Sequence, residues 1–117
     1  MVNASPMPSA LTGLRAFVVE DETLVAIYLE DLLEELGCAV VGTAGQVSRA
    51  ISQIETLRPD IAIIDINLAG EDAYPIASAL TRHRIHFIFA TGYGDGRLPP
   101  DWRHCPIIQK PYHKADL

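Results

Sequence analysis

Residues 61–65 read Ile-Ala-Ile-Ile-Asp, a short apolar run that ends on a carboxylate. Continuous apolar runs of this length are typical of strands that are covered on both faces, as in parallel sheets. Three further apolar runs have polar residues at or just beyond their ends; they are residues 15–19, 86–90 and 105–109. The residues that follow them are Glu20 and Asp21, then Thr91, then Lys110. Because parallel strands bring their carboxyl ends to one edge of a sheet, the sequence predicts that these side chains meet at one site.

Amphipathic helices are expected between the strands. Apolar residues recur at helical spacing over residues 23–36 and again over residues 46–57. Gly37 is placed to cap the first helix, and Pro59 ends the second because proline disfavours helix in the residue before it. Residues 38–43, which lie between the two helices, are expected to form the second strand.

The second half of the chain continues the alternation less regularly. A loop around Gly70 leads into a third helix, with Asp72 as its N-cap and its end near Arg82. Residues 92–100 hold three glycines and two prolines, and this density predicts a short or irregular fourth helix. Residues 112–117 are enough only to begin a fifth helix, which we therefore expect to be truncated.

The alternation of strand and helix predicts an α/β fold with a parallel sheet. Five strands fit the doubly wound, flavodoxin-like order 2-1-3-4-5. This order places the first and third strands side by side, and so brings Glu20, Asp21 and Asp65 together. Residues 1–13 contain two prolines and lack charged side chains, and we expect them to form a flexible N-terminal tail. The rest of the chain, residues 14–117, is expected to form one domain.

Composition excludes several classes of protein. With 9 Lys and Arg against 15 Asp and Glu, the chain has a net charge of -6, which argues against a nucleic-acid partner. Its apolar runs are far too short to span a membrane, and residues 1–13 lack the basic start of a secretory signal. Cys38 and Cys105 lack the paired spacing of a zinc site or redox motif. We therefore expect a cytoplasmic protein.

The predicted site has a definite chemistry. Three carboxylates within a few ångströms repel one another, so that either one of them takes a proton or a cation compensates. Oxygen ligands without His or Cys favour Mg²⁺, which also binds phosphate oxygens. Lys110 and Thr91 offer an ammonium and a hydroxyl to the same oxygens. An ionised aspartate can attack a phosphoryl group, and Asp65, at the end of the central strand, has the best position to do so.

Four segments resemble the signature regions of the response-regulator receiver domain. They are Val-Val-Glu-Asp-Glu at 18–22, Ile-Ile-Asp-Ile-Asn-Leu at 63–68, Ala-Thr-Gly at 90–92 and Gln-Lys-Pro-Tyr at 109–112. Each segment alone is a weak signal, but all four in this order at strand ends are highly specific. The resemblance extends over about residues 15–117. Residues 89–92, Phe-Ala-Thr-Gly, further resemble a subfamily of receiver proteins that are often single-domain or act in general-stress signalling of alphaproteobacteria.

The resemblance implies a phosphorylation switch of a two-component system or phosphorelay. Asp65 would accept phosphate from a histidine kinase or a phosphotransfer protein. Asp21, Asp65 and the backbone carbonyl of Asn67 would hold Mg²⁺, and Glu20 would act through metal-bound water. Such a domain is a phosphoacceptor that catalyses its own phosphorylation and dephosphorylation, not an enzyme acting on a separate substrate. In this family the first helix is the docking surface for kinases, which makes Leu24 and Tyr28 the residues to test.

The resemblance also implies how the signal leaves the site. Lys110 would bind a phosphoryl oxygen, and Thr91 would close on the phosphoryl group and carry the change outward. Receiver domains usually have Tyr or Phe three residues before the Lys, where this chain has Ile107. We therefore advance Tyr93 as the replacement for the missing aromatic switch residue. No output domain is expected in this chain, so its effect would pass through a protein partner, with the chain as a monomer or weak dimer.

Two other classes of function stay open on the residues alone. A Mg²⁺-dependent phosphohydrolase with an aspartyl-phosphate intermediate would use similar groups, but it usually has a second acid just after the nucleophile. Ile66 and Asn67 stand there instead. A pseudo-receiver, which binds partners without being phosphorylated, would have lost site residues that this chain keeps.

Overall fold

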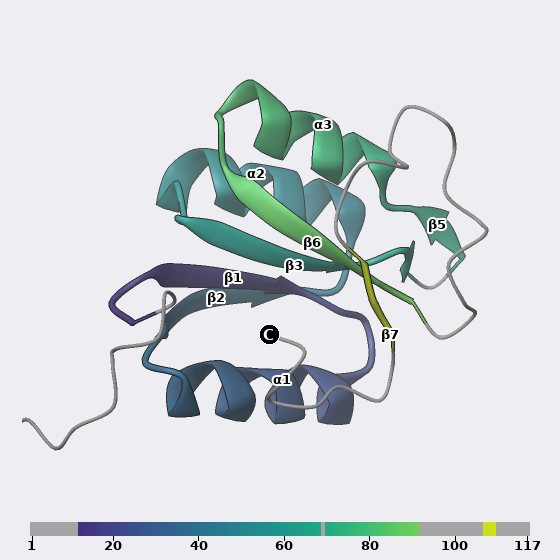
Figure 1. The fold of residues 1–117 in the computed structure, drawn as a ribbon. Helices are drawn as coiled ribbons and strands as arrows, with labels where there is room; N and C mark the ends of the chain where they lie inside the picture. The colour runs from purple at the N-terminus through teal and green to yellow at the C-terminus, as the bar shows by residue number, and fades with distance from the viewer. Residues whose placement is uncertain (1–11, 69, 92–106, 110–117) are drawn as a thin grey trace, which may run out of the picture.

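The computed structural model describes residues 12–68, 70–91 and 107–109. The elements in chain order are β1 Arg15–Val19, α1 Thr23–Glu35, β2 Ala39–Ala44, α2 Val47–Leu57, β3 Ile61–Asp65, β4 Asn67–Leu68, β5 Glu71–Asp72, α3 Tyr74–Arg82, β6 His86–Thr91 and β7 Ile107–Gln109. Five strands form a parallel sheet in the order β2-β1-β3-β6-β7 (Figure 1). Since β6 and β7 are the fourth and fifth strands of this sheet along the chain, the predicted order 2-1-3-4-5 is confirmed.

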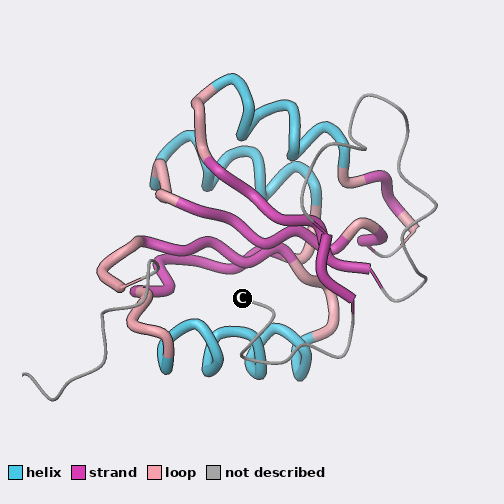
Figure 2. The backbone as a smooth tube through the Cα atoms, viewed as in Figure 1, coloured by secondary structure: helices cyan, strands magenta, loops and turns pink. Residues whose placement is uncertain are grey.

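The sheet is the middle layer of the molecule. Helix α1 covers one face, and α2 and α3 cover the other (Figure 2). Alternate residues of β3 enter the two cores: Ala62 and Ile64 pack under α2 and α3, whereas Ile61 and Ile63 pack under α1. This burial on both sides explains why the run at 61–64 is apolar without a break.

The ends of the helices follow the predicted signals in most places. Gly37 lies just beyond α1 with φ +95°, its amide donates to the carbonyl of Glu34, and the amide of Cys38 donates to Leu33. These two hydrogen bonds form a Schellman motif, as the position of this glycine predicted. Asp72 is not the N-cap of α3, which is Ala73, but its Oδ1 accepts the amide of Tyr74 at 2.9 Å.

The loop predicted around Gly70 differs from the structure. Strands β4 and β5 pair in an antiparallel hairpin, with Asn67 opposite Asp72 and Leu68 opposite Glu71. Gly70, at φ +85°, supplies the left-handed residue that a tight turn of this kind needs. The second strand also begins and ends one residue later than predicted, at Ala39 and Ala44.

Several predictions concern residues outside the described ranges. They are most of the N-terminal tail at 1–13, the irregular fourth helix over 92–100 and the truncated fifth helix over 112–117. Within the described ranges, no helix is both long enough and apolar enough to cross a membrane.

Candidate functional site

The carboxyl ends of β1, β3 and β6 lie at the same edge of the sheet. Val19 is paired with Ile64, Asp65 with Ala90, and Thr91 with Gln109. The residues that end these strands are therefore held side by side by the hydrogen-bond register of a parallel sheet. The prediction that polar strand ends meet at one edge is confirmed for the backbone of β1, β3 and β6.

Glu20 directly extends β1 and is held by its neighbours. Its amide donates to the carbonyl of Ala44 at 2.9 Å, which continues the pairing of β1 with β2 by one residue. The side chain is buried, with 5% of its surface exposed, and its Oε2 accepts the amide of Glu22 at 3.2 Å. Glu22 is the N-cap of α1, so this bond ties the carboxylate to the start of the helix. Asp21, between them, is exposed.

Asp65 is the last residue of β3 and is 6% exposed. The amide of Ile66 donates to the carbonyl of Ala90 at 3.0 Å, so the pairing of β3 with β6 continues past Asp65. The aspartate therefore lies on a backbone fixed by β6, one residue after Ile64, which pairs with Val19 of β1. Asp65 and Glu20 are the only charged residues among those described that are buried.

Carboxylate oxygens of Glu20, Asp21 and Asp65 all lie within 4.8 Å of one another. Two ionised carboxylates at such a separation repel by about 3 kcal/mol at an effective dielectric constant of about 20. Burial of two of the three adds a desolvation cost for each charge. A bound cation offsets both costs, and an all-oxygen donor set with an exposed member suits Mg²⁺, which keeps part of its water.

The remaining predicted site residues are described less fully. Asn67 is the first residue of β4 and Thr91 the last of β6, and for these two the structure gives the course of the backbone. Lys110, Tyr93 and Pro111 lie outside the described residues. Gln109, the residue before Lys110, is paired with Thr91, which brings the chain back to the carboxyl edge at that point.

The hairpin after Asp65 adds contacts that the sequence did not predict. The Glu71 carboxylate accepts the amide of Val47, the first residue of α2, at 3.5 Å. Tyr74, which follows the hairpin, packs edge-on against Phe89 of β6, with ring centroids 6.0 Å apart. Burial and, to a smaller extent, the Asp72 carboxylate raise the pKa of the Tyr74 hydroxyl. An acidic residue beside a glycine turn gave no signal that it would reach another helix.

Helix α1 presents large apolar side chains to solvent. Leu24 is 81% exposed, Ile27 48% and Tyr28 47%. They lie in the first two turns of the helix, close to the acidic cluster in the chain. Two of them, Leu24 and Tyr28, are the residues that the sequence singled out for partner binding.

The chain is similar in sequence and in fold to known receiver-domain proteins. The chain matches the response regulator receiver domain family over residues 16–105. It is similar to the solution structure of SdrG from Sphingomonas melonis Fr1, with 42% identity, a TM-score of 0.79 and coverage of 92% of this chain and 91% of that one. The BeF3-activated conformation of SdrG from Pseudomonas melonis Fr1 is 41% identical, with a TM-score of 0.75 and coverage of 86% and 87%.

The chain is also similar in sequence to a curated regulatory protein. The transcriptional regulatory protein PdtaR of Mycobacterium tuberculosis is 34% identical over 107 residues, which are 88% of this chain and 52% of that protein. The chain thus spans about half the length of these curated relatives.

Proposed function

The chain belongs to the response regulator receiver domain family, and from that premise we propose that it is the phosphoacceptor of a two-component system or phosphorelay, with Asp65 as the residue that takes the phosphoryl group. Receiver domains are signalling modules rather than enzymes, which favours this function over the phosphohydrolase. The observation that carries the proposal is the buried Asp65 carboxylate, clustered with two further carboxylates at the carboxyl edge of the sheet.

The position of Asp65 suits a nucleophile. Its backbone is paired with Ala90 of β6 and follows Ile64, which is paired with Val19 of β1, so the carboxylate is held in place without a cost at the moment of reaction. Its carboxylate is mostly shielded from water, where fixed charges act more strongly than in solvent. Attack of one carboxylate oxygen on phosphorus forms the acyl-phosphate bond, and the bond from phosphorus to the donor histidine breaks.

The acidic cluster fits a divalent metal ion, and we assign it to Mg²⁺, which receiver domains generally bind. Asp21, Asp65 and the Asn67 carbonyl would hold the ion, and Glu20 would act through its water. When bound, Mg²⁺ neutralises the carboxylates and draws phosphate oxygens to the site. Glu20 is itself oriented by the Glu22 amide, so it also links the metal site to the start of α1.

We assign the response to Thr91 and Lys110, as in the family. Lys110 would contact a phosphoryl oxygen, and Thr91 would move toward it. With Ile107 in place of the usual aromatic residue, Tyr93 is the candidate for passing this movement on. A Tyr93→Ala variant tests the assignment: phosphorylation should still occur, but the change in partner affinity that follows it should be lost.

Receiver domains interact in general with histidine kinases and phosphotransfer proteins, and we propose that such a partner docks on α1. The exposed Leu24, Ile27 and Tyr28 support this surface, because they would be covered on docking and lie next to the acidic cluster in sequence. We further propose that the domain spans residues 14–117 and that it acts in the cytoplasm.

Beryllofluoride, which mimics a phosphoryl group on aspartate, tests the proposed function. A relative, SdrG, has a solved conformation described as BeF3-activated, so the probe suits this domain type. With Mg²⁺ present, we expect beryllofluoride to shift amide resonances of β3, β6 and the β4–β5 hairpin. Asp65→Asn should abolish the shifts, and Asp72→Asn, which alters an exposed carboxylate nearby, should keep them. Equal shifts in wild type and Asp65→Asn, or none in wild type, would reject the proposal.

A further inference from the structure

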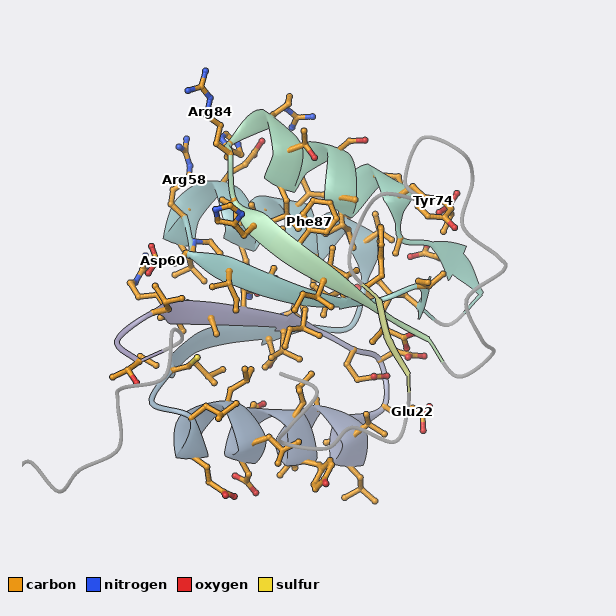
Figure 3. The ribbon with its side chains drawn as sticks, in the orientation of Figure 1. Glu22, Arg58, Asp60, Tyr74, Arg84 and Phe87 are labelled. Atoms are coloured by element: carbon orange, nitrogen blue, oxygen red, sulfur yellow. The ribbon has the colours of Figure 1, made fainter. Side chains whose placement is uncertain are left out.

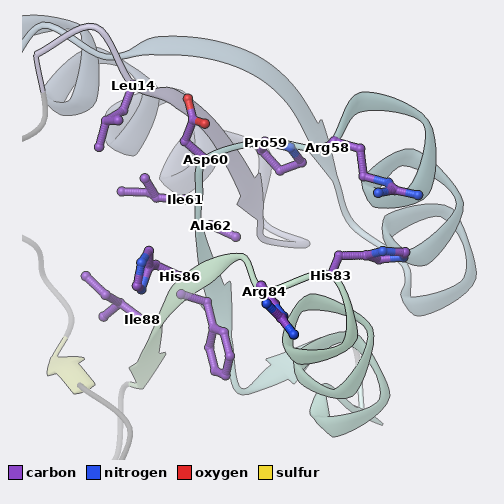
Figure 4. Close-up of a pocket in the computed structure, with 11 residues that line it drawn as sticks. Leu14, Arg58, Pro59, Asp60, Ile61, Ala62, His83, Arg84, His86 and Ile88 are labelled. Atoms are coloured by element: carbon purple, nitrogen blue, oxygen red, sulfur yellow. The ribbon is translucent and has the colours of Figure 1, made fainter.

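A pocket of about 730 Å³ opens at the amino edge of the sheet, at the opposite ends of the strands from the acidic cluster. We call it the basal pocket. It lies where the loop after α2 and the loop after α3 meet the starts of β3 and β6 (Figure 4). The lining includes four basic side chains, which are Arg58, His83, Arg84 and His86, and apolar groups that include Pro59 and Phe87.

The charge of the basal pocket is unusual for this protein. Arg58 and Arg84 line it, and the guanidinium of Arg15 lies beside it, donating to the carbonyl of Arg58 at 2.9 Å. Against these three cations stand one carboxylate, Asp60, and the C-terminal ends of α2 and α3, each equivalent to about half a negative charge. The balance is about one positive charge, in a chain whose net charge is -6.

Both arginines that line the basal pocket have a left-handed backbone. Arg58 has φ +46° and Arg84 has φ +59°, and they are the only non-glycine residues with positive φ among those described. A side chain is disfavoured in this region, and helices usually place glycine there. An arginine at such a position holds its guanidinium at the end of the helix at some cost in backbone strain.

The end of helix α1 shows the same backbone motif with glycine at the left-handed position. At the end of α3, the amide of Arg84 donates to Thr81 and the amide of Ile85 to Leu80, which is the same Schellman motif that α1 closes with Gly37. The chain thus uses glycine for this motif at one helix end and arginine at the other. Strained residues of this kind concentrate at functional sites, where the side chain is needed for its chemistry.

The polar groups of the basal pocket lie beside apolar lining residues. Figure 4 shows Arg58, His83 and Arg84 on the side of the pocket next to the two helix ends. The Nε2 atom of His83 is buried and has no hydrogen-bond partner in the described part of the chain. Nε of Arg58 donates to the carbonyl of Glu55 at 3.1 Å, which fixes the direction of that side chain.

We propose that the basal pocket binds a small organic anion, with its phosphate or carboxylate group between Arg58 and Arg84 and its apolar part against Pro59 and Phe87. A volume of about 730 Å³ is in the range of sites for molecules of nucleotide size and exceeds what a bare phosphate ion fills. Guanidinium groups bind such oxyanions through paired, charge-assisted hydrogen bonds. The ligand would occupy the end of β3 and β6 opposite to Asp65, and its binding does not depend on phosphorylation.

A matched set of probes tests the proposal on the whole chain by NMR without Mg²⁺. We expect 1-naphthyl phosphate to give saturable shifts of the amides of Arg58, Arg84 and Phe87. Neither 1-naphthol, which lacks the charge, nor inorganic phosphate, which lacks the ring, should bind as tightly as 1-naphthyl phosphate. Equal binding of 1-naphthol would reject the anion site, and equal binding of inorganic phosphate would reject the organic ligand.

Variants separate the site from general electrostatics. Arg58→Gln with Arg84→Gln should raise the dissociation constant of 1-naphthyl phosphate about tenfold or more, because charge-assisted hydrogen bonds are lost. Arg49→Gln, which removes one positive charge from the exposed, opposite end of α2, is the control for each single substitution and should leave the dissociation constant unchanged. Arg84→Gly preserves the left-handed backbone and should still weaken binding. Unchanged affinity in both pocket variants, or an equal loss in Arg49→Gln, would overturn the proposal.

Discussion

The two edges of the parallel sheet carry opposite charges and hold them in different ways. At the carboxyl edge, Glu20 and Asp65 are buried and lie with Asp21 in a cluster of like charges. At the amino edge, Arg58 and Arg84 are exposed and sit on left-handed backbone. Figure 3 shows Glu22, beside the acidic cluster, and the two arginines at opposite ends of the molecule.

The two edges differ in the kind of unfavourable free energy that each contains. The acidic edge stores it as electrostatic repulsion between desolvated carboxylates, which a divalent cation relieves. The basic edge stores it in the backbone, because exposed guanidinium groups are well hydrated and screened. A bound cation should therefore stabilise the acidic edge, whereas a substitution that relieves backbone strain should stabilise the basic edge.

The largest expected effect is on the metal affinity of the acidic edge. Asp21→Asn removes a charged ligand and should weaken Mg²⁺ binding by about 100-fold, at the upper end of what the loss of a supporting group costs. A Mg²⁺ titration followed by NMR measures this. Asp31→Asn, which removes an exposed carboxylate from α1, is the control and should bind Mg²⁺ as wild type does. Similar weakening of Mg²⁺ binding in both variants would mean that the net charge of the protein, and not a ligand at Asp21, sets the affinity.

A smaller effect is expected at the amino edge. Arg84→Gly relieves a left-handed side chain, a gain of about 1–2 kcal/mol, and loses about 0.5–1 kcal/mol through the freer unfolded chain. The free energy of unfolding should rise by about 0.5–1 kcal/mol in urea denaturation. Arg82→Gly, two residues earlier at the last residue of α3, should instead lower it by about 1 kcal/mol. A loss of stability in Arg84→Gly would show that the left-handed backbone there carries no strain.

The smallest effect concerns the stability of the acidic edge without metal. Asp21 is exposed, so its repulsion with Glu20 and Asp65 is screened, and Asp21→Asn should raise the free energy of unfolding by only about 0.5 kcal/mol without Mg²⁺. This gain should shrink at high salt, as screening weakens the repulsion. Added Mg²⁺ should reverse the order, stabilising wild type more than the variant. If the variant were less stable without Mg²⁺, the clustered carboxylates would not be in repulsive contact.

The carboxyl edge was far easier to predict than the amino edge. Strand ends in a parallel sheet lie together by topology, so the apolar runs before Glu20 and Asp65 were enough to predict their meeting. The same runs predicted the strand order, because burial on both faces leaves a continuous apolar pattern.

The amino edge depends on features that leave no such pattern. Arg58 and Arg84 come together through two loops whose conformation is set by helix ends, and their left-handed backbone goes against the usual preference for glycine. The β4–β5 hairpin and the reach of Glu71 to α2 were missed for a similar reason, because two-residue strands give no periodicity.

The most direct test of the function is transfer of radiolabelled phosphate from candidate histidine kinases or phosphotransfer proteins. We expect wild type and Asp72→Asn to take up label in the presence of Mg²⁺, and the label to be released by hydroxylamine, as an acyl phosphate is. Asp65→Asn should take up none. Labelling of Asp65→Asn to the level of wild type, by the same donor, would contradict the assignment of Asp65 as the phosphoacceptor.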